Sequence, residues 1–275
     1  LNRARVHVEI EWLIFLLDNS VLPGAPKLTD AERDYLRALP RDFGADHIKR
    51  LGEFEAVTRH DVKAVEYLIG EYLEAAASRL GEETSLPALR EVVHIFCTSE
   101  DINNLAYALT IKAATEQVWL PAIRALLDRL RGLAEAGAAV PMLAHTHGQP
   151  ATPVTVGKEM AVFAHRLSRQ MRRVEATEYL GKINGATGTW AAHVVSVPGT
   201  DWPTLARAFV EGLGLTWNPL TTQIESHDWQ AELYSDVARA GRIAHNLATD
   251  AWTYISMDYF HQNLAAQGST GSSTM

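Results

Sequence analysis

The chain has 275 residues, of which 47% are hydrophobic, and its formal net charge is −8. A hydrophobic fraction of this size is sufficient for a large core and excludes a disordered or fibrous protein. The chain has no excess of lysine and arginine with which to follow a nucleic-acid backbone or an anionic membrane, so we expect neither as a partner. Its single cysteine, Cys97, excludes an intrachain disulfide, and the charged N-terminal segment is neither a membrane span nor a signal peptide. We therefore expect a cytoplasmic protein.

Helical periodicity is the main pattern along the chain. A helix is predicted in the N-terminal segment RARVHVEIEWLIFLLDN, and another begins at Thr29, where Thr29 and Glu32 have the spacing of a capping box. Residues 61–80 carry apolar side chains at intervals of three and four, and Gly81 marks the end of that helix. Longer helices are predicted in the tracts 100–136 with a bend at Pro121, 154–180, and 226–264. Helices of this length are typical of an extended bundle, often shared between subunits, and no long strand alternation is present.

Irregular segments rich in turn-forming residues separate the long helices, at 140–153, 181–202 and 215–226. Polar residues whose side chains can bind ligands or take part in catalysis concentrate in these segments. Loops on a rigid scaffold are the usual place for binding and catalysis. One of them contains GKINGATG, which lacks the GK[ST] ending of a nucleotide phosphate loop and follows no predicted strand. Its glycines are therefore predicted to permit a tight turn or a close backbone approach.

The segment AHTHGQP contains the pair His145 and His147. Metal hydrolases use this H-x-H spacing when both imidazoles leave the end of a strand toward one ion, but no strand is predicted here. The two histidines can instead form hydrogen bonds in a loop between helices, or one of them can act as a general acid or base, because the pKa of histidine lies near neutral pH. The residues alone leave these alternatives open.

Charged and hydroxyl residues stand at two further helix starts. In Arg59-His60-Asp61, the acid suits the positive end of a helix, and the arginine suits a carboxylate or phosphate. In TSED, Ser99 is a plausible N-cap, with two acids in the first turn of the helix. The same geometry offers hydroxyl and backbone N–H groups to an anion, so capping and ligand binding are compatible.

Five motifs, TSEDINN, THGQPATP, KINGATG, NPLTTQIE and GSSTM, occur in this order along the chain. In order and spacing they resemble bacterial-type adenylosuccinate lyases of the fumarase/aspartase superfamily, and the similarity covers nearly the whole chain. The resemblance implies an all-α fold, a long-helix bundle of the fumarase/aspartase type with a smaller N-terminal helical domain. It implies an N-terminal helical domain at 1–97 and an incomplete bundle domain at 98–275, with the C-terminal domain absent from this chain. The P-x-K-x-N-P continuation and an N-terminal Arg-Tyr segment are also missing, so we expect both ends to be cut, and His145 stands where many relatives have arginine.

The resemblance also implies a reaction and its residues. The family eliminates fumarate from adenylosuccinate, giving AMP, and from the succinylated imidazole carboxamide ribotide SAICAR, giving AICAR, with no cofactor and no metal. Its members are homotetramers in which three subunits form each active site. His147 matches the general acid and Ser272 the base. The matched substrate-binding residues are Arg59, His60, Asp61, Thr98, Ser99, Thr146, Gln223 and Ser273, with Lys158, Lys182 and Asn184 as further candidates.

Three alternatives remain beside this interpretation. A sister lyase acting on argininosuccinate, fumarate or aspartate shares the superfamily motifs, although KINGATG and TTQIESHDW favour the purine branch. A structural oligomer that keeps the lyase fold needs neither His147 nor Ser272, and both are present. A metal hydrolase using His145 and His147 requires further ligands and a bound ion.

Overall fold

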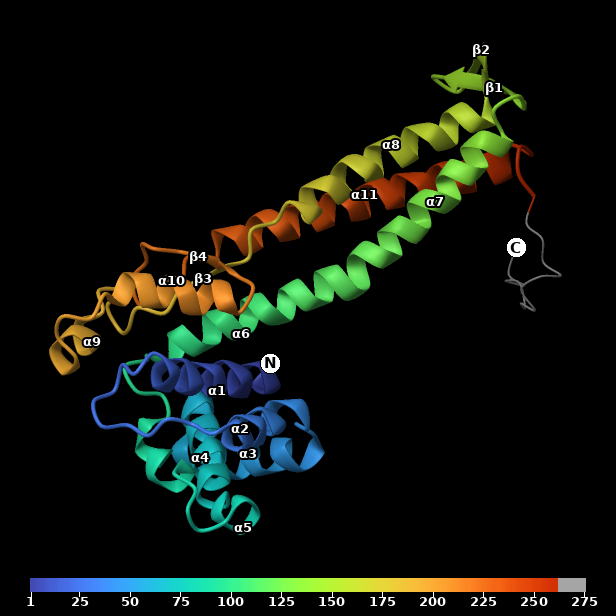
Figure 1. The fold of residues 1–275 in the computed structure, drawn as a ribbon. Helices are drawn as coiled ribbons and strands as arrows, with labels where there is room; N and C mark the ends of the chain where they lie inside the picture. Colours follow the sequence, from blue (N-terminus) through green and yellow to red (C-terminus); the bar gives the residue numbers. More distant parts are fainter. Residues whose placement is uncertain (262–275) are drawn as a thin grey trace. The chain divides into compact units, whose positions relative to one another are not determined.

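A computed structural model describes residues 1–261 of the chain (Figure 1), and in this part the predicted, predominantly helical fold is confirmed. The helices are α1 (Asn2–Asp18), α2 (Asp30–Arg41), α3 (Ala45–Thr58), α4 (Asp61–Glu74), α5 (Ala77–Leu80), the 3₁₀ helix η1 (Leu86–Val92), α6 (Ser99–Ala114), the π-helical turn η2 (Thr115–Trp119), α7 (Leu120–Ala136), α8 (Val156–Glu175), α9 (Ala191–Ser196), α10 (Trp202–Gly212) and α11 (Asp228–Ser256). The strands are β1 (Pro141–Thr146), β2 (Gln149–Thr155), β3 (Leu180–Gly181) and β4 (Thr216–Trp217). None of the described helices is long and apolar enough to cross a membrane.

The chain divides into two compact units. The first unit consists of Leu1–Thr115 and Glu178–Trp229, and the second of Glu116–Thr177 and the segment from Gln230 onward. The domain boundary predicted at residue 97 stays a prediction, because these units describe packing and not which segments fold independently.

The core of the first unit is built around α1. This helix is apolar on more than one face, as is typical of a helix enclosed by its neighbours. Val6, Ile10 and Leu13 pack with buried side chains of α2 and α4. At the start of α2 the predicted capping box is confirmed, since the Thr29 N–H donates to the Glu32 carboxylate at 2.9 Å and the Glu32 N–H donates to the Thr29 hydroxyl at 3.2 Å.

In the second unit, α7, α8 and α11 run side by side (Figure 1). Their shared core is apolar and takes Leu127 and Leu130 from α7, Phe163 and Leu167 from α8, and Ile243 from α11. The β1–β2 hairpin joins α7 to α8 at one end of these helices. The predicted long-helix bundle is therefore present in this unit.

The predicted helix 100–136 is interrupted by η2, just ahead of Pro121. Proline has no N–H to donate, and its ring collides with the carbonyl four residues earlier, here that of Gln117. A π-helical turn accommodates this displaced carbonyl. The sequence thus located the irregularity, and its form is a change in hydrogen bonding over Thr115–Trp119.

Other predicted helix ends were wrong by several residues. The helix predicted at 61–80 ends as α4 at Glu74, and α5 follows as a separate turn closed by Gly81. The helix predicted at 226–264 begins at Asp228 and ends at Ser256, where the chain turns and Asp258 adopts a φ of 61°. The helix predicted at 154–180 covers Val156–Glu175.

The prediction of an irregular loop without strands at 140–153 was wrong. This segment forms the antiparallel hairpin β1–β2, with Thr146 paired to Gln149 across a two-residue turn. His147 and Gly148 in that turn both have positive φ, of 53° and 73°, as a type I′ turn requires. The hairpin escaped prediction because β2 contains two prolines, which are unfavourable in a paired strand, and lacks a clear alternation of apolar residues.

Candidate functional site

The TSED motif lies at the N-terminus of α6. Thr98, and not Ser99 as predicted, is the N-cap residue, and its N–H donates to the Asp101 carboxylate at 2.8 Å. Ser99 is the first residue of the helix. Its hydroxyl and the N–H groups at the start of the helix are therefore placed where a helix end favours an anion.

Asp101 connects this motif to the KING segment. Its carboxylate is fully buried and accepts hydrogen bonds from the Lys182 ammonium at 2.8 Å, the Asn184 N–H at 3.0 Å and the Gly185 N–H at 3.1 Å. Lys182 is also fully buried. The sequence interpretation of Lys182 as a further substrate contact is thus corrected, because its ammonium is buried and bonded to Asp101. Removing either partner would leave the other charge buried and uncompensated.

The TTQ loop, residues 221–223, is hydrogen-bonded to both the KING segment and the TSED motif. Asn184 donates its side-chain amide to the Thr221 hydroxyl at 2.7 Å, and Gln223 donates to the Thr98 hydroxyl at 3.0 Å. Gly188 has a φ of 71°, and a Cβ at this position would collide with the Thr221 carbonyl. The glycine thus permits the close backbone approach that the sequence predicted.

His60 is the N-cap of α4 and lies at the same place. Its Nδ1 accepts a hydrogen bond from the Lys63 N–H at 3.2 Å, so the neutral ring carries its proton on Nε2. That Nε2 lies 3.4 Å from the Ser99 hydroxyl. Arg59 is exposed and adopts a left-handed conformation, with φ 55°, at the end of α3. The predicted residues His60, Thr98, Ser99 and Gln223 therefore form one group of hydrogen-bonding side chains in the first unit, in which His60 and Gln223 are exposed and Thr98 and Ser99 are half-buried.

Arg5 supports this group and was missed by the sequence analysis. It is 5% exposed, and its guanidinium donates to Asp61 at 2.5 Å and to Asn103 at 2.9 Å. Burial alone would raise the pKa of Asp61, but the charge of Arg5 and the Val62 N–H outweigh it and lower this pKa. Asp61 is thus held ionised and already paired, and it acts as a support next to His60. The ring Nδ1 of His60 lies 3.7 Å from the Asp61 carboxylate.

The remaining predicted residues belong to the second unit. Thr146 ends β1, and His147 lies in the hairpin turn, with both side chains exposed. A left-handed conformation is uncommon for a residue other than glycine and often marks a functional position. It also takes His147 out of the extended strand, so that His145 and His147 do not share one strand face as a simple H-x-H pair. The exposed Lys158 lies in the first turn of α8, whereas Ser272 and Ser273 lie outside the described residues.

Comparison of the sequence with known proteins identifies the family of the chain. Residues 14–275 match the sequence model of the family described as "Lyase". The chain belongs to this lyase family. It is 44% identical over 275 residues to the adenylosuccinate lyase of Escherichia coli K12, 42% to that of Legionella pneumophila Philadelphia 1 and 41% to that of Haemophilus influenzae Rd. Each comparison covers the whole chain but 59% of the relative, so this lyase chain spans about three fifths of the curated relatives it matches.

Solved structures agree on the fold. A fumarate lyase from Mesorhizobium sp. BNC1 superposes with a TM-score of 0.74 at 20% identity, covering 94% of this chain and 55% of that one. The β-carboxy-cis,cis-muconate cycloisomerase of Acinetobacter calcoaceticus sp. ADP1 gives a TM-score of 0.72 at 17% identity, covering 92% and 55%. The lyase fold predicted from the motifs is therefore confirmed.

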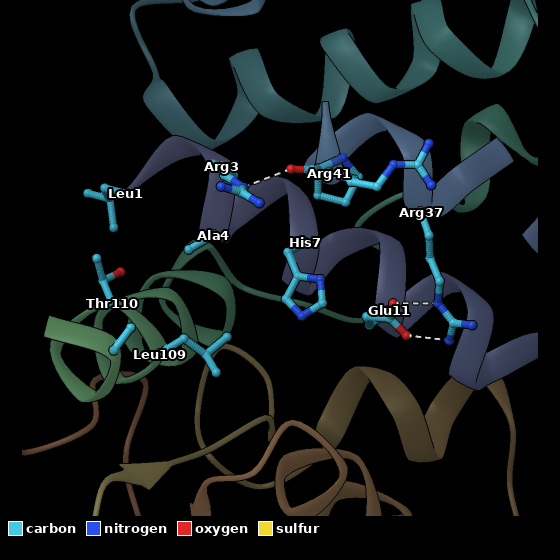
Figure 2. Close-up of a pocket in the computed structure, with 11 residues that line it drawn as sticks. Leu1, Arg3, Ala4, His7, Glu11, Arg37, Arg41, Leu109 and Thr110 are labelled. Atoms are coloured by element: carbon cyan, nitrogen blue, oxygen red, sulfur yellow. Dashed lines mark hydrogen bonds and ion pairs between the residues drawn. The ribbon is translucent and has the colours of Figure 1, made fainter. Parts of the chain in front are cut away.

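A cavity of about 660 Å³ in the first unit of the lyase chain contains none of the predicted site residues. It is lined by α1, α2 and α6 and contains three arginines (Figure 2). Arg37 is paired with Glu11 through two bonds of 2.8 Å, Arg3 donates to the Pro40 carbonyl, and Arg41 is paired with Asp42. Each of these guanidinium groups thus already has a hydrogen-bond partner on the protein. The described residues also contain no cluster of three or more His, Cys, Asp or Glu suited to a metal ion.

Proposed function

We propose that the protein of which this chain forms a part is an adenylosuccinate lyase. The observation that carries the proposal is that Asp101 joins the TSED and KING motifs, while Gln223 of the TTQ loop bonds to Thr98 and His60 lies beside Ser99, so that hydroxyl, amide and imidazole groups lie together at one partly exposed place. Such a group suits a substrate with several carboxylate or phosphate oxygens. The identity of 44% with an adenylosuccinate lyase over the whole chain supports the choice of substrate.

The proposed reaction is a β-elimination. Ser272 removes a proton from the succinyl carbon next to a carboxylate, and the C–H electron pair forms the new C=C bond. The C–N bond then breaks, its electrons pass to the nitrogen, and His147 supplies the proton that this nitrogen needs. The products are fumarate and the free amine. The amine is AMP when the substrate is adenylosuccinate and AICAR when it is SAICAR. A serine is a weak base, so hydrogen-bond donors must stabilise its alkoxide.

Thr98, Ser99, His60 and Gln223 bind the carboxylate and phosphate oxygens in this proposal. Negative charge increases on the carboxylate next to the carbanion, so donors fixed in advance stabilise the transition state more than the ground state. The buried contacts of Asp101 with Lys182 and Asn184 supply that fixation.

We further propose a homotetramer with active sites shared between subunits. The predicted acid and the predicted binding group belong to different compact units of the chain. Several large apolar side chains of the second unit are exposed, among them Val118, Val162 and Trp252, with Trp252 exposed to 72%. Apolar surface on long helices is typical of a bundle completed by further subunits. The cytoplasmic location expected from the sequence stays a prediction.

The test is an assay of the full-length protein with both purine substrates. We expect adenylosuccinate absorbance to fall while AMP and fumarate appear in equal amounts. A folded tetramer that releases no fumarate from adenylosuccinate or SAICAR would contradict the proposal, and assays with argininosuccinate, fumarate and aspartate would then separate a sister lyase from a structural oligomer.

A further inference from the structure

The β1–β2 hairpin has an irregular position close to its tip. The strand register shifts between Leu143 and His145, so this part of the ladder is a bulge. The Leu143 carbonyl accepts a hydrogen bond from the Tyr259 hydroxyl at 3.0 Å, and the His145 Nδ1 lies 3.1 Å from the same oxygen. A tyrosine from beyond the end of α11 therefore binds the hairpin backbone four residues before His147.

Tyr259 is itself held in an aromatic cluster, composed of His145, Tyr254, Tyr259 and Phe260. Its ring meets those of His145 and Tyr254 edge-on, at centroid distances of 6.3 and 6.2 Å, and Tyr254 meets Phe260 at 5.6 Å. The Tyr254 hydroxyl donates to Glu159 of α8 at 3.0 Å. The cluster thus connects the hairpin to the ends of α8 and α11.

The base of the hairpin is fixed separately. The Val156 N–H donates to the Val140 carbonyl at 3.0 Å, and the Gly157 N–H to the Gly137 carbonyl at 2.9 Å. A Cβ on Gly157 would collide with the Ala134 carbonyl, so the ends of α7 and α8 approach each other closely here. An isolated two-stranded hairpin is marginally stable in water, and its exposed tip needs additional contacts to keep one conformation.

We propose that Tyr259 is a positioning residue for His147. By binding the Leu143 carbonyl at the bulge, it fixes the twist of the hairpin and so the place from which His147 donates its proton. Bulges next to active sites commonly direct a side chain in this way. The role in catalysis rests on the proposed function, whereas the restraint on the hairpin does not.

The test compares two matched variants of the full-length protein. Tyr259→Phe removes the hydroxyl that binds the hairpin and keeps the ring, whereas Tyr254→Phe removes a hydroxyl from the same cluster that binds α8. We expect Tyr259→Phe to lower kcat ~10-fold and to change KM by less than about twofold, because the residues proposed above to bind the substrate oxygens, His60, Thr98, Ser99 and Gln223, belong to the first unit. We expect Tyr254→Phe to retain kcat within about twofold. Equal losses in both variants, or an unchanged kcat in Tyr259→Phe, would overturn the proposal.

A double-mutant cycle tests whether Tyr259 acts through His147. In a His147→Gln background, Tyr259→Phe should cause no further loss of kcat, whereas a general effect on structure would multiply with the first loss. Hydrogen exchange gives a readout independent of activity. The hairpin amides should exchange faster in Tyr259→Phe than in the wild type and Tyr254→Phe, and unchanged exchange would overturn the restraint. If the wild type released no fumarate, the proposed function alone would fail, and exchange would still decide whether Tyr259 restrains the hairpin.

Discussion

In the first unit the half-buried Thr98 and the exposed Gln223 lie next to a fully buried carboxylate, Asp101, whereas in the second unit His147 occupies the exposed turn of a two-stranded hairpin. The first arrangement is fixed by buried charges and hydrogen bonds between segments far apart in the chain. The second is fixed by a local turn, with support from the aromatic cluster at Tyr259. Substitutions in the first region should therefore change stability and substrate affinity, and those in the second should change turnover.

The largest effect is expected at the hairpin turn. His147→Gln removes the proposed proton donor and should lower kcat by ~10³-fold, while the free energy of unfolding changes by no more than about 0.5 kcal/mol. His165→Gln, at an exposed position of α8, is the matched control and should retain most of the turnover, because His165 belongs to neither the hairpin nor the aromatic cluster. Fumarate release and urea denaturation provide the two measurements. A large loss of stability in His147→Gln would remove the contrast between the two regions.

The buried ion pair should dominate the stability of the first unit. Lys182→Met leaves Asp101 buried without its counter-ion, and we expect the free energy of unfolding to fall by about 3–5 kcal/mol. Lys158→Met changes an exposed lysine of the second unit and should alter this quantity by less than about 0.5 kcal/mol. Chemical denaturation of both variants gives the comparison. Equal stabilities of the two variants would show that Asp101 does not anchor the site.

A buried histidine makes the first unit sensitive to acid. Burial lowers the pKa of His193 from 6.5 to about 4, and neither ring nitrogen has a hydrogen-bond partner among the described residues. As pH falls below 6.5, the unfolded chain takes up this proton before the folded protein does. The free energy of unfolding should therefore decrease by about 3 kcal/mol between pH 6.5 and 4 on account of this residue.

His193→Phe is the corresponding variant. It keeps an aromatic ring against Phe96 and Trp202 and removes the titrating group. Thermal denaturation across this pH range should show a flatter profile than that of the wild type. The same slope in both proteins would mean that His193 does not become protonated on unfolding.

The smallest effect concerns Ser99, one of the proposed substrate ligands. Ser99→Ala removes a hydroxyl that lies close to His60 and should raise KM ~5-fold, with kcat changed less, because one hydrogen bond to a charged group is lost. Ser78→Ala, in the exposed turn α5, should leave both constants unchanged. Steady-state kinetics measures both variants, and an effect on kcat alone would place Ser99 in the chemical step.

Local signals in the sequence located several of the helices, although not all of their ends. Thr29 with Glu32 located the start of α2, and the periodicity before Gly81 located α4, since capping and amphipathicity depend on residues a few positions apart. Pro121 predicted a bend in the long helix, and the structure has a π-helical turn just ahead of it. The hairpin was missed because β2 contains two prolines and no clear alternation of apolar residues, and because its turn has histidine at a position where asparagine or aspartate is usual.

Residues that support the site depend on distant partners and were invisible in the sequence. Asp101 was interpreted as a helix-capping acid, and its bond to Lys182 spans 81 positions. Arg5 was not considered, because Asp61 is 56 positions away. The proposed substrate ligands were named from motifs in the sequence. The buried groups beneath them could be identified only from the packing of α1, α4 and α6.

The proposal that both regions serve one active site shared between subunits has a direct test. His147→Gln and the double variant Thr98→Val/Ser99→Ala are unfolded together and refolded, and mixed tetramers are verified by mass spectrometry. The first variant lacks the proposed acid and the second lacks two proposed substrate contacts, so both homotetramers should release fumarate far more slowly than the wild type at substrate concentrations well below KM, where the rates are compared. If the acid and the binding group of each site come from different subunits, random mixing should restore about a quarter of the wild-type rate of fumarate release. Verified mixed tetramers that remain inactive would contradict the account.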